Sequence, residues 1–278
     1  MDYLLTEEQK QLQALARDIA QNTVAPKAEY YDHQNEFPWE VVKVFAQADL
    51  FRVFIPEEYD GLGMGVFELC LVTEELSRAC GGIALALAGT ALGTEPILIM
   101  GNEEQKRKYL PRIASGQSLA AFGLTEANAG SDASAVRTRA VKDGDSYILN
   151  GTKQWITNGG EADIYTVIAA TDPGRGARGL SAFIVEKGTP GFEFGKKEDK
   201  LGIRASATRE LVFQDCRIPA ENLLGKEGMG FITVMRTFDR TRPGVASQAV
   251  GIAQGAFDHA LAYAKERRQF GQPISSFQ

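Results

Sequence analysis

The chain has 278 residues, of which 44% are hydrophobic and 24% are charged, and its formal net charge is −6 at pH 7. This composition is typical of a soluble globular protein of one large or two ordinary domains, and the negative charge argues against nucleic acid as a partner, because clustered Lys and Arg bind phosphate backbones. Three cysteines and two histidines argue against a closed disulfide framework and leave little material for a zinc site or a histidine-based triad.

The first 116 residues predict an N-terminal α-helical domain. Thr6 and Gln9 have the spacing of a capping box, and apolar residues then recur at helical intervals until Pro26. Further helices are expected after Phe37-Pro38, at 68–78, at 83–100 and at 102–109, the last interrupted at Pro111.

The N-terminus is acidic and soon polar, and lacks the basic start and long apolar stretch of a signal peptide. The longest apolar run, Ile83 to Gly93, is too short to span a bilayer and leads into Glu95-Pro96. We therefore expect a cytoplasmic protein without membrane insertion.

Residues 117–226 predict a middle β domain. Short strands are expected at 147–150, 165–170, 181–186, 192–194 and 210–213, separated by Gly-containing turns. Short strands without intervening helices favour an antiparallel barrel or sandwich. The segment Gly174–Gly179 fits the pattern G-x-G-x-x-G, but it precedes a strand instead of opening a helix, so we interpret it as a hairpin and not as a dinucleotide-binding loop.

Residues 227–278 predict the start of a C-terminal helical domain. A long apolar stripe begins at Phe231 and continues past Pro243-Gly244 to Ala264. Such a stripe requires partner helices, as in a bundle, and a single helix cannot bury it. Either other chains cover this face, or the sequence is a fragment of a longer protein; the fragment is our preferred interpretation.

Two polar stretches about 25 residues apart carry the most informative chemistry. They are 124–132 (LTEANAGSD), where helix-like sequence gives way to strand-like sequence, and 154–160 (QWITNGG), at the end of a strand. Both offer hydroxyls and exposed backbone amides, and Trp155 adds a ring face two residues from the Thr157 hydroxyl. On physical grounds alone they are either two surface turns or a site for a flat polar ligand.

These two stretches resemble the flavin-contacting pair of the acyl-CoA dehydrogenases, TEP-x-AGSD and WITNG, although Ala127 stands in place of the usual proline. The resemblance extends over essentially the whole chain and implies FAD as cofactor. It implies that Phe122, Leu124 and Thr125 lie along the isoalloxazine ring. It also implies that Trp155, Ile156 and Thr157 lie beside the flavin, with Thr157 near N5. It also places Gly130 and Ser131 at the pyrophosphate and ligand end.

Two further segments match the family. Within 238–242 (FDRTR), the resemblance makes Asp239 and Arg242 contacts of the CoA moiety, with Arg240, Thr241 and Ser131 as further substrate candidates. Some members place the catalytic glutamate at the position of Thr241, which cannot act as a carboxylate base, so we expect the glutamate after Gln278. Within 265–278 the signature ER-x-x-FG-x-PI implies that Arg267 and Gln278 contact the FAD of a neighbouring subunit.

The activity implied by the resemblance is α,β-desaturation of an acyl-CoA thioester. A glutamate removes the α proton while a hydride leaves the β carbon for the flavin, and electrons pass to an electron-transferring flavoprotein. The implied assembly is a homo-oligomer, with a tetramer as the expected size. An acyl-CoA oxidase, an enoyl-CoA reductase of the same fold and a non-catalytic flavin- or acyl-CoA-binding fragment stay open as alternatives.

Overall fold

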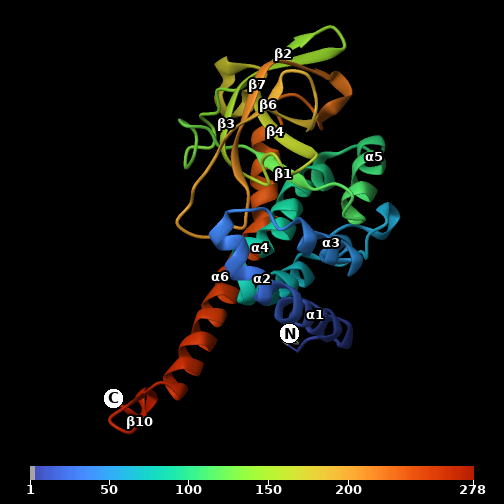
Figure 1. The fold of residues 1–278 in the computed structure, drawn as a ribbon. Helices are drawn as coiled ribbons and strands as arrows, with labels where there is room; N and C mark the ends of the chain where they lie inside the picture. Colours follow the sequence, from blue (N-terminus) through green and yellow to red (C-terminus); the bar gives the residue numbers. More distant parts are fainter. Residues whose placement is uncertain (1–3) are drawn as a thin grey trace.

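The computed structural model describes residues 4–278. Helices occupy one end of the molecule, a β-sheet domain lies above them, and one long helix, α6, passes from the sheet along the helical layer and projects beyond it (Figure 1). The predicted combination of an N-terminal helical domain, a middle β domain and a C-terminal helix is confirmed. The helices are α1 (Glu7–Ile19), α2 (Ala25–Gln34), α3 (Trp39–Gln47), α4 (Val66–Met100), α5 (Glu103–Ala114) and α6 (Gly230–Glu266).

Local sequence signals explain most helix boundaries. Thr6 and Gln9 form the expected capping box of α1, and a second capping box, made by Asn102 and Gln105, opens α5. A π-helical turn at Ala20–Val24 joins α1 to α2, with Pro26 in the first turn of α2. The predicted interruption at Pro111 is wrong, because α5 continues through that residue to Ala114.

Helix α4 is sharply bent at Cys80, whose backbone is extended (φ −161°, ψ 111°). The two predicted helices at 68–78 and 83–100 are thus the two legs of one bent element. The bend reverses the direction of α4 relative to α6. Before the bend, Glu74 lies against Gly251 and Arg78 against Gly255, so the two helices run in the same direction. After the bend, Gly81 contacts Gln248 and Glu95 contacts Arg240, so the helices run in opposite directions.

The middle domain is an eight-stranded sheet in the order β6-β7-β3-β2-β4-β5-β8, with β1 also paired to β4. Most pairs are antiparallel, as expected, but β4 pairs in parallel with both β1 and β2. Strands β1, β2 and β8 lie outside the predicted set. The strands are β1 (Ala120–Gly123), β2 (Arg139–Asp143), β3 (Ser146–Thr157), β4 (Ile164–Ala170), β5 (Leu180–Glu186), β6 (Phe192–Lys197), β7 (Thr208–Pro219) and β8 (Leu223–Leu224).

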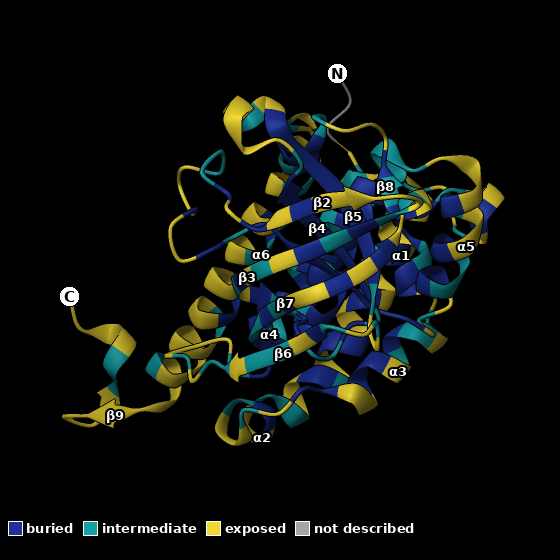
Figure 2. Cartoon of the chain, turned by 90° about the horizontal axis from the view of Figure 1, so that it is seen from above, coloured by how far each residue is buried: buried dark blue, intermediate teal, exposed yellow. Residues whose placement is uncertain are grey.

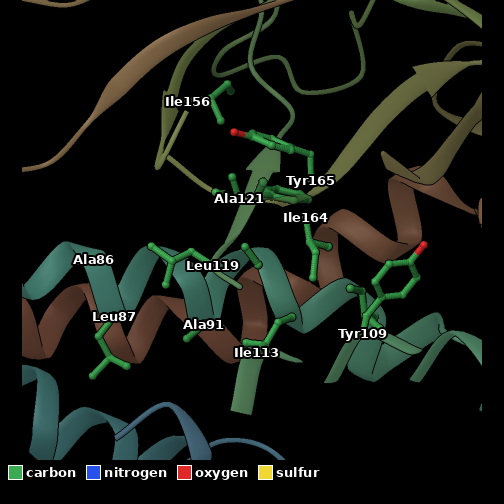
Figure 3. Packing of buried hydrophobic residues seen from close by; sticks show 14 of the residues in the cluster. Ala86, Leu87, Ala91, Tyr109, Ile113, Leu119, Ala121, Ile156, Ile164 and Tyr165 are labelled. Atoms are coloured by element: carbon green, nitrogen blue, oxygen red, sulfur yellow. The ribbon is translucent and has the colours of Figure 1, made fainter. Parts of the chain in front are cut away.

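The sheet packs on α4 and α5 through fully buried apolar side chains. Leu119, Ala121 and Ile164 from the β domain face Ala86 and Ala91 of α4 in one continuous core (Figure 3). Among residues 4–278, α4 alone is long and apolar enough to cross a membrane, but 67% of its most apolar window is buried within the protein. Its composition is therefore explained by its central place in the core.

The segment Pro173–Gly179 is a turn between β4 and β5, as the hairpin interpretation predicts. Gly225 and Gly228 adopt positive φ in the connection that leads into α6. The outer half of α6, followed by a small hairpin of β9 (Arg268–Gln269) and β10 (Gln272–Pro273), lies mostly exposed (Figure 2). Val250, Phe257 and Leu261 on this half are exposed apolar side chains.

Candidate functional site

The two polar stretches meet where β1 and β3 end. The Gln154 backbone N–H donates to the Thr125 carbonyl oxygen at 2.8 Å, so the loop that follows β1 is hydrogen-bonded to the last residues of strand β3. Register between β3 and β7 slips between Lys153 and Ile156, which marks a β-bulge. Trp155 lies in this bulge with φ +57°, a left-handed conformation that is rare for a bulky residue, and the residue is 55% exposed. A strained bulge that redirects a side chain is typical of a functional site.

Six of the predicted cofactor residues line a single small cavity. Its volume is about 160 Å³, and the side chains around it are mainly apolar. The hydroxyls of Thr125 and Thr157 form no hydrogen bond with another group of the described chain, so both are free to contact a ligand. The lining consists of Gly89, Leu92, Phe122, Leu124, Thr125, Trp155, Ile156, Thr157 and Phe238.

A larger cavity of about 660 Å³ continues from the small one. It lies between the two legs of α4 and residues 238–249 of α6, and the two cavities share Gly89, Leu92, Thr157 and Phe238. Its exposed wall is mainly apolar, although Glu95, Arg240 and Arg242 also line it. The Phe238 ring meets the Phe122 ring edge-on, with centroids 6.1 Å apart. A mainly apolar cavity thus opens beside the Thr157 hydroxyl, an arrangement suited to an apolar chain that ends near a polar reacting group.

Gly89 permits the close approach of α4 to the end of β3. A Cβ at this position would lie 2.8 Å from Thr157 Cγ2 and 3.2 Å from Asn158 Nδ2. The buried Asn158 amide fixes the same contact, because Nδ2 lies 3.2 Å from both Thr90 Oγ1 and the Ala120 carbonyl oxygen. The position of Thr157 is therefore set by backbone proximity as well as by the strand.

A buried ion pair lies beneath the site. Lys153 is fully buried, and its Nζ donates to Glu126 Oε1 at 2.7 Å and to the Leu124 carbonyl oxygen at 3.0 Å. Glu126 also accepts hydrogen bonds from the Arg137 and Thr138 backbone N–H groups (2.7 and 3.0 Å) and from Thr138 Oγ1 (2.6 Å). The pair therefore links the loop after β1, the segment before β2 and strand β3.

Each member of this pair favours the ionised form of the other. Burial lowers the pKa of the Lys153 ammonium to about 8, even though Glu126 acts in the opposite direction. Burial would raise the pKa of the Glu126 carboxyl, but the charge of Lys153, together with hydrogen bonds from Lys153, Thr138 and Arg137, outweighs it and lowers that pKa. Both groups are consequently ionised at neutral pH.

A second buried carboxyl, Glu95, belongs to the large cavity. Its side chain is 4% exposed, and Oε2 lies 3.0 Å from Nε of Arg240, whose side chain is 50% exposed. Despite this distance, the angle is not that of a hydrogen bond, and Oε2 receives none from the described chain. Burial raises the pKa of the Glu95 carboxyl, and the charge of Arg240 offsets this only in part.

The predicted substrate residues of α6 divide between cavity wall and surface. Arg240, Thr241 and Arg242 line the large cavity. The Thr241 hydroxyl donates to the Thr237 carbonyl oxygen at 2.9 Å, as is usual within helices. Asp239 is exposed and forms an ion pair with Arg242 at 3.2 Å. Arg242 also places its guanidinium carbon 5.5 Å from the centre of the Phe238 ring.

Besides Asp239, four predicted residues lie outside both cavity linings. Gly130 and Ser131 are exposed in the loop beyond Ala129, and a Cβ at Gly130 would meet nothing within 4 Å. Arg267 and Gln278 are exposed at the far end of α6, remote from the β domain (Figure 1). The resemblance assigns the last two to a neighbouring subunit's cofactor, and that assignment stays a prediction.

The sequence interpretation missed Lys153, Glu126, Glu95, Gly89 and Phe238. Lys153 had a detectable signal, because alternation along β3 from Tyr147 and Leu149 puts it on the core face. The others are defined by partners far away in the sequence. Within the described range 4–278, no group of three or more His, Cys, Asp or Glu side chains is placed to hold a metal ion.

Three family models match consecutive parts of the chain. They are the N-terminal, middle and C-terminal domains of acyl-CoA dehydrogenase, over residues 6–117, 121–216 and 228–278. The chain belongs to the acyl-CoA dehydrogenase family. The resemblance inferred from the two polar stretches is thus confirmed, and with it the class of enzyme, an oxidoreductase of the flavoprotein type.

Individual relatives agree over nearly the whole chain. The short-chain-specific acyl-CoA dehydrogenase of Clostridium acetobutylicum is 48% identical over 279 residues, which cover 100% of this chain and 74% of the relative. The butyryl-CoA dehydrogenase structure from Megasphaera elsdenii is 46% identical with a TM-score of 0.97, covering 100% and 74% of the two chains. A structure described as the electron transferring flavoprotein of Acidaminococcus fermentans is 50% identical with a TM-score of 0.98, covering 100% and 73%.

Two other relatives bear on cofactor and reaction. An acyl-CoA dehydrogenase from Bacillus anthracis, solved in complex with FAD, is 39% identical with a TM-score of 0.91, covering 98% of this chain and 47% of that one. An acryloyl-CoA reductase (NADH) from Anaerotignum propionicum is 47% identical, covering 100% and 71%.

Proposed function

We propose that this protein is an FAD-dependent acyl-CoA dehydrogenase that introduces an α,β double bond into an acyl-CoA thioester. The observation that carries the proposal is the continuity of the two cavities. A small cavity edged by the free hydroxyls of Thr125 and Thr157 opens into a larger, mainly apolar cavity between α4 and α6. This geometry suits a planar redox group beside the reacting end of an apolar chain.

The small cavity fits the edge of a flavin. Phe122, Leu124 and Ile156 provide apolar contact, the exposed Trp155 indole provides a ring face, and the Thr125 and Thr157 hydroxyls provide donors. The resemblance adds Gly130 and Ser131 toward the pyrophosphate. When bound, FAD supplies the two-electron acceptor for the reaction. The contribution of this chain is to hold donors in place and to keep water from the reacting atoms.

The large cavity fits the acyl chain of the substrate. Its mainly apolar walls exclude water from the carbons to be desaturated. Asp239, Arg240, Thr241 and Arg242 of α6, together with Ser131 of the loop after β1, are our candidates for contacts with the rest of the acyl-CoA molecule. Arg242 offers a planar fork for phosphate or carbonyl oxygens. Thr241 has no carboxylate and therefore cannot be the proton-removing base.

We further propose a cytoplasmic homo-oligomer, with a tetramer as the expected size, that passes electrons to an electron-transferring flavoprotein. The match to a structure described under that name supports the choice of partner. The exposed apolar side chains on the outer half of α6 support the association of subunits. In such an assembly Arg267 and Gln278 would reach the FAD of a neighbour.

The test is the visible spectrum of the protein purified without added cofactor, followed by anaerobic addition of saturated acyl-CoA thioesters. We expect flavin bands, release of FAD on denaturation, bleaching of the bands by substrate and formation of the enoyl-CoA. A protein that binds no flavin, or whose flavin no acyl-CoA bleaches, would overturn the proposal. Rapid peroxide release on reoxidation would identify an oxidase instead.

The reductase relative favours one second candidate, enoyl-CoA reduction in the cell. Supplying an enoyl-CoA with reduced electron-transferring flavoprotein, and comparing kcat/KM with that of the forward reaction, distinguishes the two directions. A reverse reaction that dominates at physiological substrate ratios would favour the reductase.

A further inference from the structure

A third cavity lies on the β domain, outside the two cavities of the proposed active site. Its volume is about 440 Å³. The lining joins the start of β2, with Ser134, Arg137 and Arg139, to the turn between β4 and β5, with Pro173 and Gly176. Two arginines and, within the described range, no acidic residue belong to this lining. We call it the basic cavity, since it is positively charged in a chain whose net charge is −6.

Arg137 and Arg139 have no anionic partner within residues 4–278. Burial alternates along 136–140, so both arginines lie on the exposed face while Thr138 between them is buried. Neither guanidinium forms an ion pair or a hydrogen bond with another described group. The neighbours of Arg139 across the sheet, Asn150 and Ala170, are uncharged. Two neighbouring cations without a counter-ion repel each other, so an anion bound between them would remove an unfavourable interaction.

The acidic residues that flank these segments in the chain have other partners. Asp132 accepts hydrogen bonds from the Ser134 backbone N–H at 3.1 Å and from its hydroxyl at 2.6 Å. Asp172 accepts one at 3.1 Å from a backbone N–H within its own turn. Asp143, at the other end of β2, forms an ion pair with Arg217 at 2.5 Å. The positive charge of the basic cavity is therefore left for a ligand.

The turn Pro173–Gly179 adds two more exposed arginines and lies against the start of α6. These are Arg175 and Arg178, and neither forms an ion pair with a described residue. A Cβ at Gly228, just before α6, would lie 2.7 Å from the Arg178 carbonyl oxygen. Phe238, which lines both active-site cavities, is eight residues beyond the first residue of α6, or roughly 12 Å along the helix. The basic cavity and the active site are thus connected along α6.

The loop after β1 provides a second connection. Thr125 at its beginning lines the small cavity, and Arg137 at its end lines the basic cavity. The Arg137 backbone N–H donates to the Glu126 carboxylate at 2.7 Å, so the two ends of the loop are adjacent. Ser131, one of our candidate substrate contacts, lies in this loop between them. A ligand that extends out of the active site past this loop therefore meets the basic cavity.

We infer that Arg137 and Arg139, supported by the two arginines of the adjoining turn, bind the phosphates of the CoA part of the substrate, an assignment that rests on the proposed function. In a CoA thioester the pantetheine arm separates the phosphates from the reacting carbons. The basic cavity is likewise separated from the active-site cavities by the loop after β1. A guanidinium offers a planar fork that matches phosphate oxygens, which makes arginine well suited to this task.

The phosphates of FAD are the other anions that the proposed function brings to this domain. The resemblance already supplies FAD with a cation, a neighbouring subunit's Arg267. The candidates for CoA on α6, Arg240 and Arg242, each lie beside a carboxyl group, at 3.0 and 3.2 Å. Arg137 and Arg139 are free of such neighbours, and their exposure suits a ligand that is exchanged in every turnover. These observations favour CoA over FAD as the ligand of the basic cavity.

The test compares the native holoenzyme with the double variant Arg137→Ala/Arg139→Ala. The acyl group that the wild type oxidises best is supplied on CoA, on 3′-dephospho-CoA and on pantetheine, which carries no phosphate. Calorimetry gives Kd, and steady-state assays give KM and kcat. With the CoA thioester we expect Kd and KM to rise about tenfold in the double variant, the lower end for a lost hydrogen bond to a charged group, because both guanidiniums are exposed. With the pantetheine thioester the two proteins should bind equally.

The 3′-dephospho-CoA thioester identifies the phosphate. A loss of affinity that disappears with this compound assigns the arginines to the 3′-phosphate, and one that persists assigns them to the pyrophosphate. Arg217→Ala is the matched control, because it removes an exposed arginine of the same sheet that already has an acidic partner, and it should leave all three Kd values unchanged. If the Tm of the double variant is lowered, Arg137→Gln/Arg139→Gln, which keeps the aliphatic stems, takes its place.

The outcomes separate the phosphate site from the proposed function. A wild-type holoenzyme that binds no acyl-CoA overturns both. A wild type that oxidises acyl-CoA, together with an unchanged Kd in the double variant, overturns the phosphate site alone. So does an equal loss of affinity for the pantetheine thioester. A double variant that loses FAD while its Kd for acyl-CoA stays unchanged would assign these arginines to the cofactor instead.

Discussion

The buried Lys153–Glu126 pair should be a principal determinant of the stability of the site. We predict that Lys153→Met lowers the free energy of unfolding by about 3 kcal/mol, the lower end of the range for breaking a buried ion pair. Methionine preserves the length of the side chain, so the loss comes from charge and hydrogen bonding rather than from a cavity. The Leu124 carbonyl oxygen loses the ammonium donor, and Glu126 keeps its three hydrogen bonds from Arg137 and Thr138.

The measurement is urea unfolding followed by tryptophan fluorescence, analysed for the midpoint and the slope of the transition. Lys142→Met is the matched control, because Lys142 is exposed on neighbouring strand β2, and surface substitutions usually change stability by less than about 0.5 kcal/mol. A loss below about 1 kcal/mol in Lys153→Met would refute the role of the pair.

A double-mutant cycle tests the pairing itself. Glu126→Gln leaves Lys153 buried without its carboxylate partner and should also destabilise the protein. The double variant should be destabilised by less than the sum of the two single effects, with a coupling of roughly 0.5–3 kcal/mol. Strict additivity would mean that the two side chains act independently, despite the 2.7 Å between Nζ and Oε1.

Three further predictions follow from the same contacts. The pKa of Lys153 is lowered from 10.5 to about 8 in the folded protein, so the unfolded state binds more protons between these two pH values. The stability of the wild type relative to Lys153→Met should therefore rise from pH 8 toward pH 10.5. Parallel pH profiles of the urea midpoints of the two proteins would contradict this. Thr157→Ala should retain FAD but slow flavin reduction by acyl-CoA roughly 10–100-fold, the loss of one hydrogen bond to a charged group, and an unchanged stopped-flow rate would count against the N5 assignment. Gly89→Ala should cost about 1–3 kcal/mol and weaken FAD retention, since its Cβ would lie 2.8 Å from Thr157 Cγ2; wild-type Tm and FAD affinity would show that the helix shifts without consequence.

The sequence predicted the architecture where the signal was local. Helical periodicity and capping boxes located α1 and α5, and short strand-like runs between Gly-containing turns located β3 to β7. Strand β1 escaped prediction because it has only four residues, Ala120–Gly123, and Ala and Gly have little preference for strands. Strand β2 escaped because four of its five residues are exposed. The parallel pairing of β1 with β4 depends on contacts that no local pattern encodes.

The candidate site divides in the same way. The residues around the small cavity could be named because they form two short motifs, and the structure brings both motifs to one place. Glu95 could not be singled out, because its partner Arg240 lies far away in the sequence, on α6. The kink at Cys80 decides which residues share the cavity, because it folds α4 into two legs around α6. Its exact geometry results from packing, which residue type alone does not specify.

The strain and the buried charge at this site are best understood together. Trp155 and Asn158 both adopt left-handed backbone conformations, each at a cost of order 1–3 kcal/mol. Such conformations persist only where surrounding contacts enforce them, and here Lys153 lies two residues before Trp155, while the Asn158 backbone N–H donates to the Ala207 carbonyl oxygen at 3.0 Å. The loop is therefore ordered before any ligand arrives, which lowers the ordering cost of binding. It follows that variants beneath the site should lose cofactor affinity by loosening the bulge, even though Lys153 is fully buried and absent from the cavity lining.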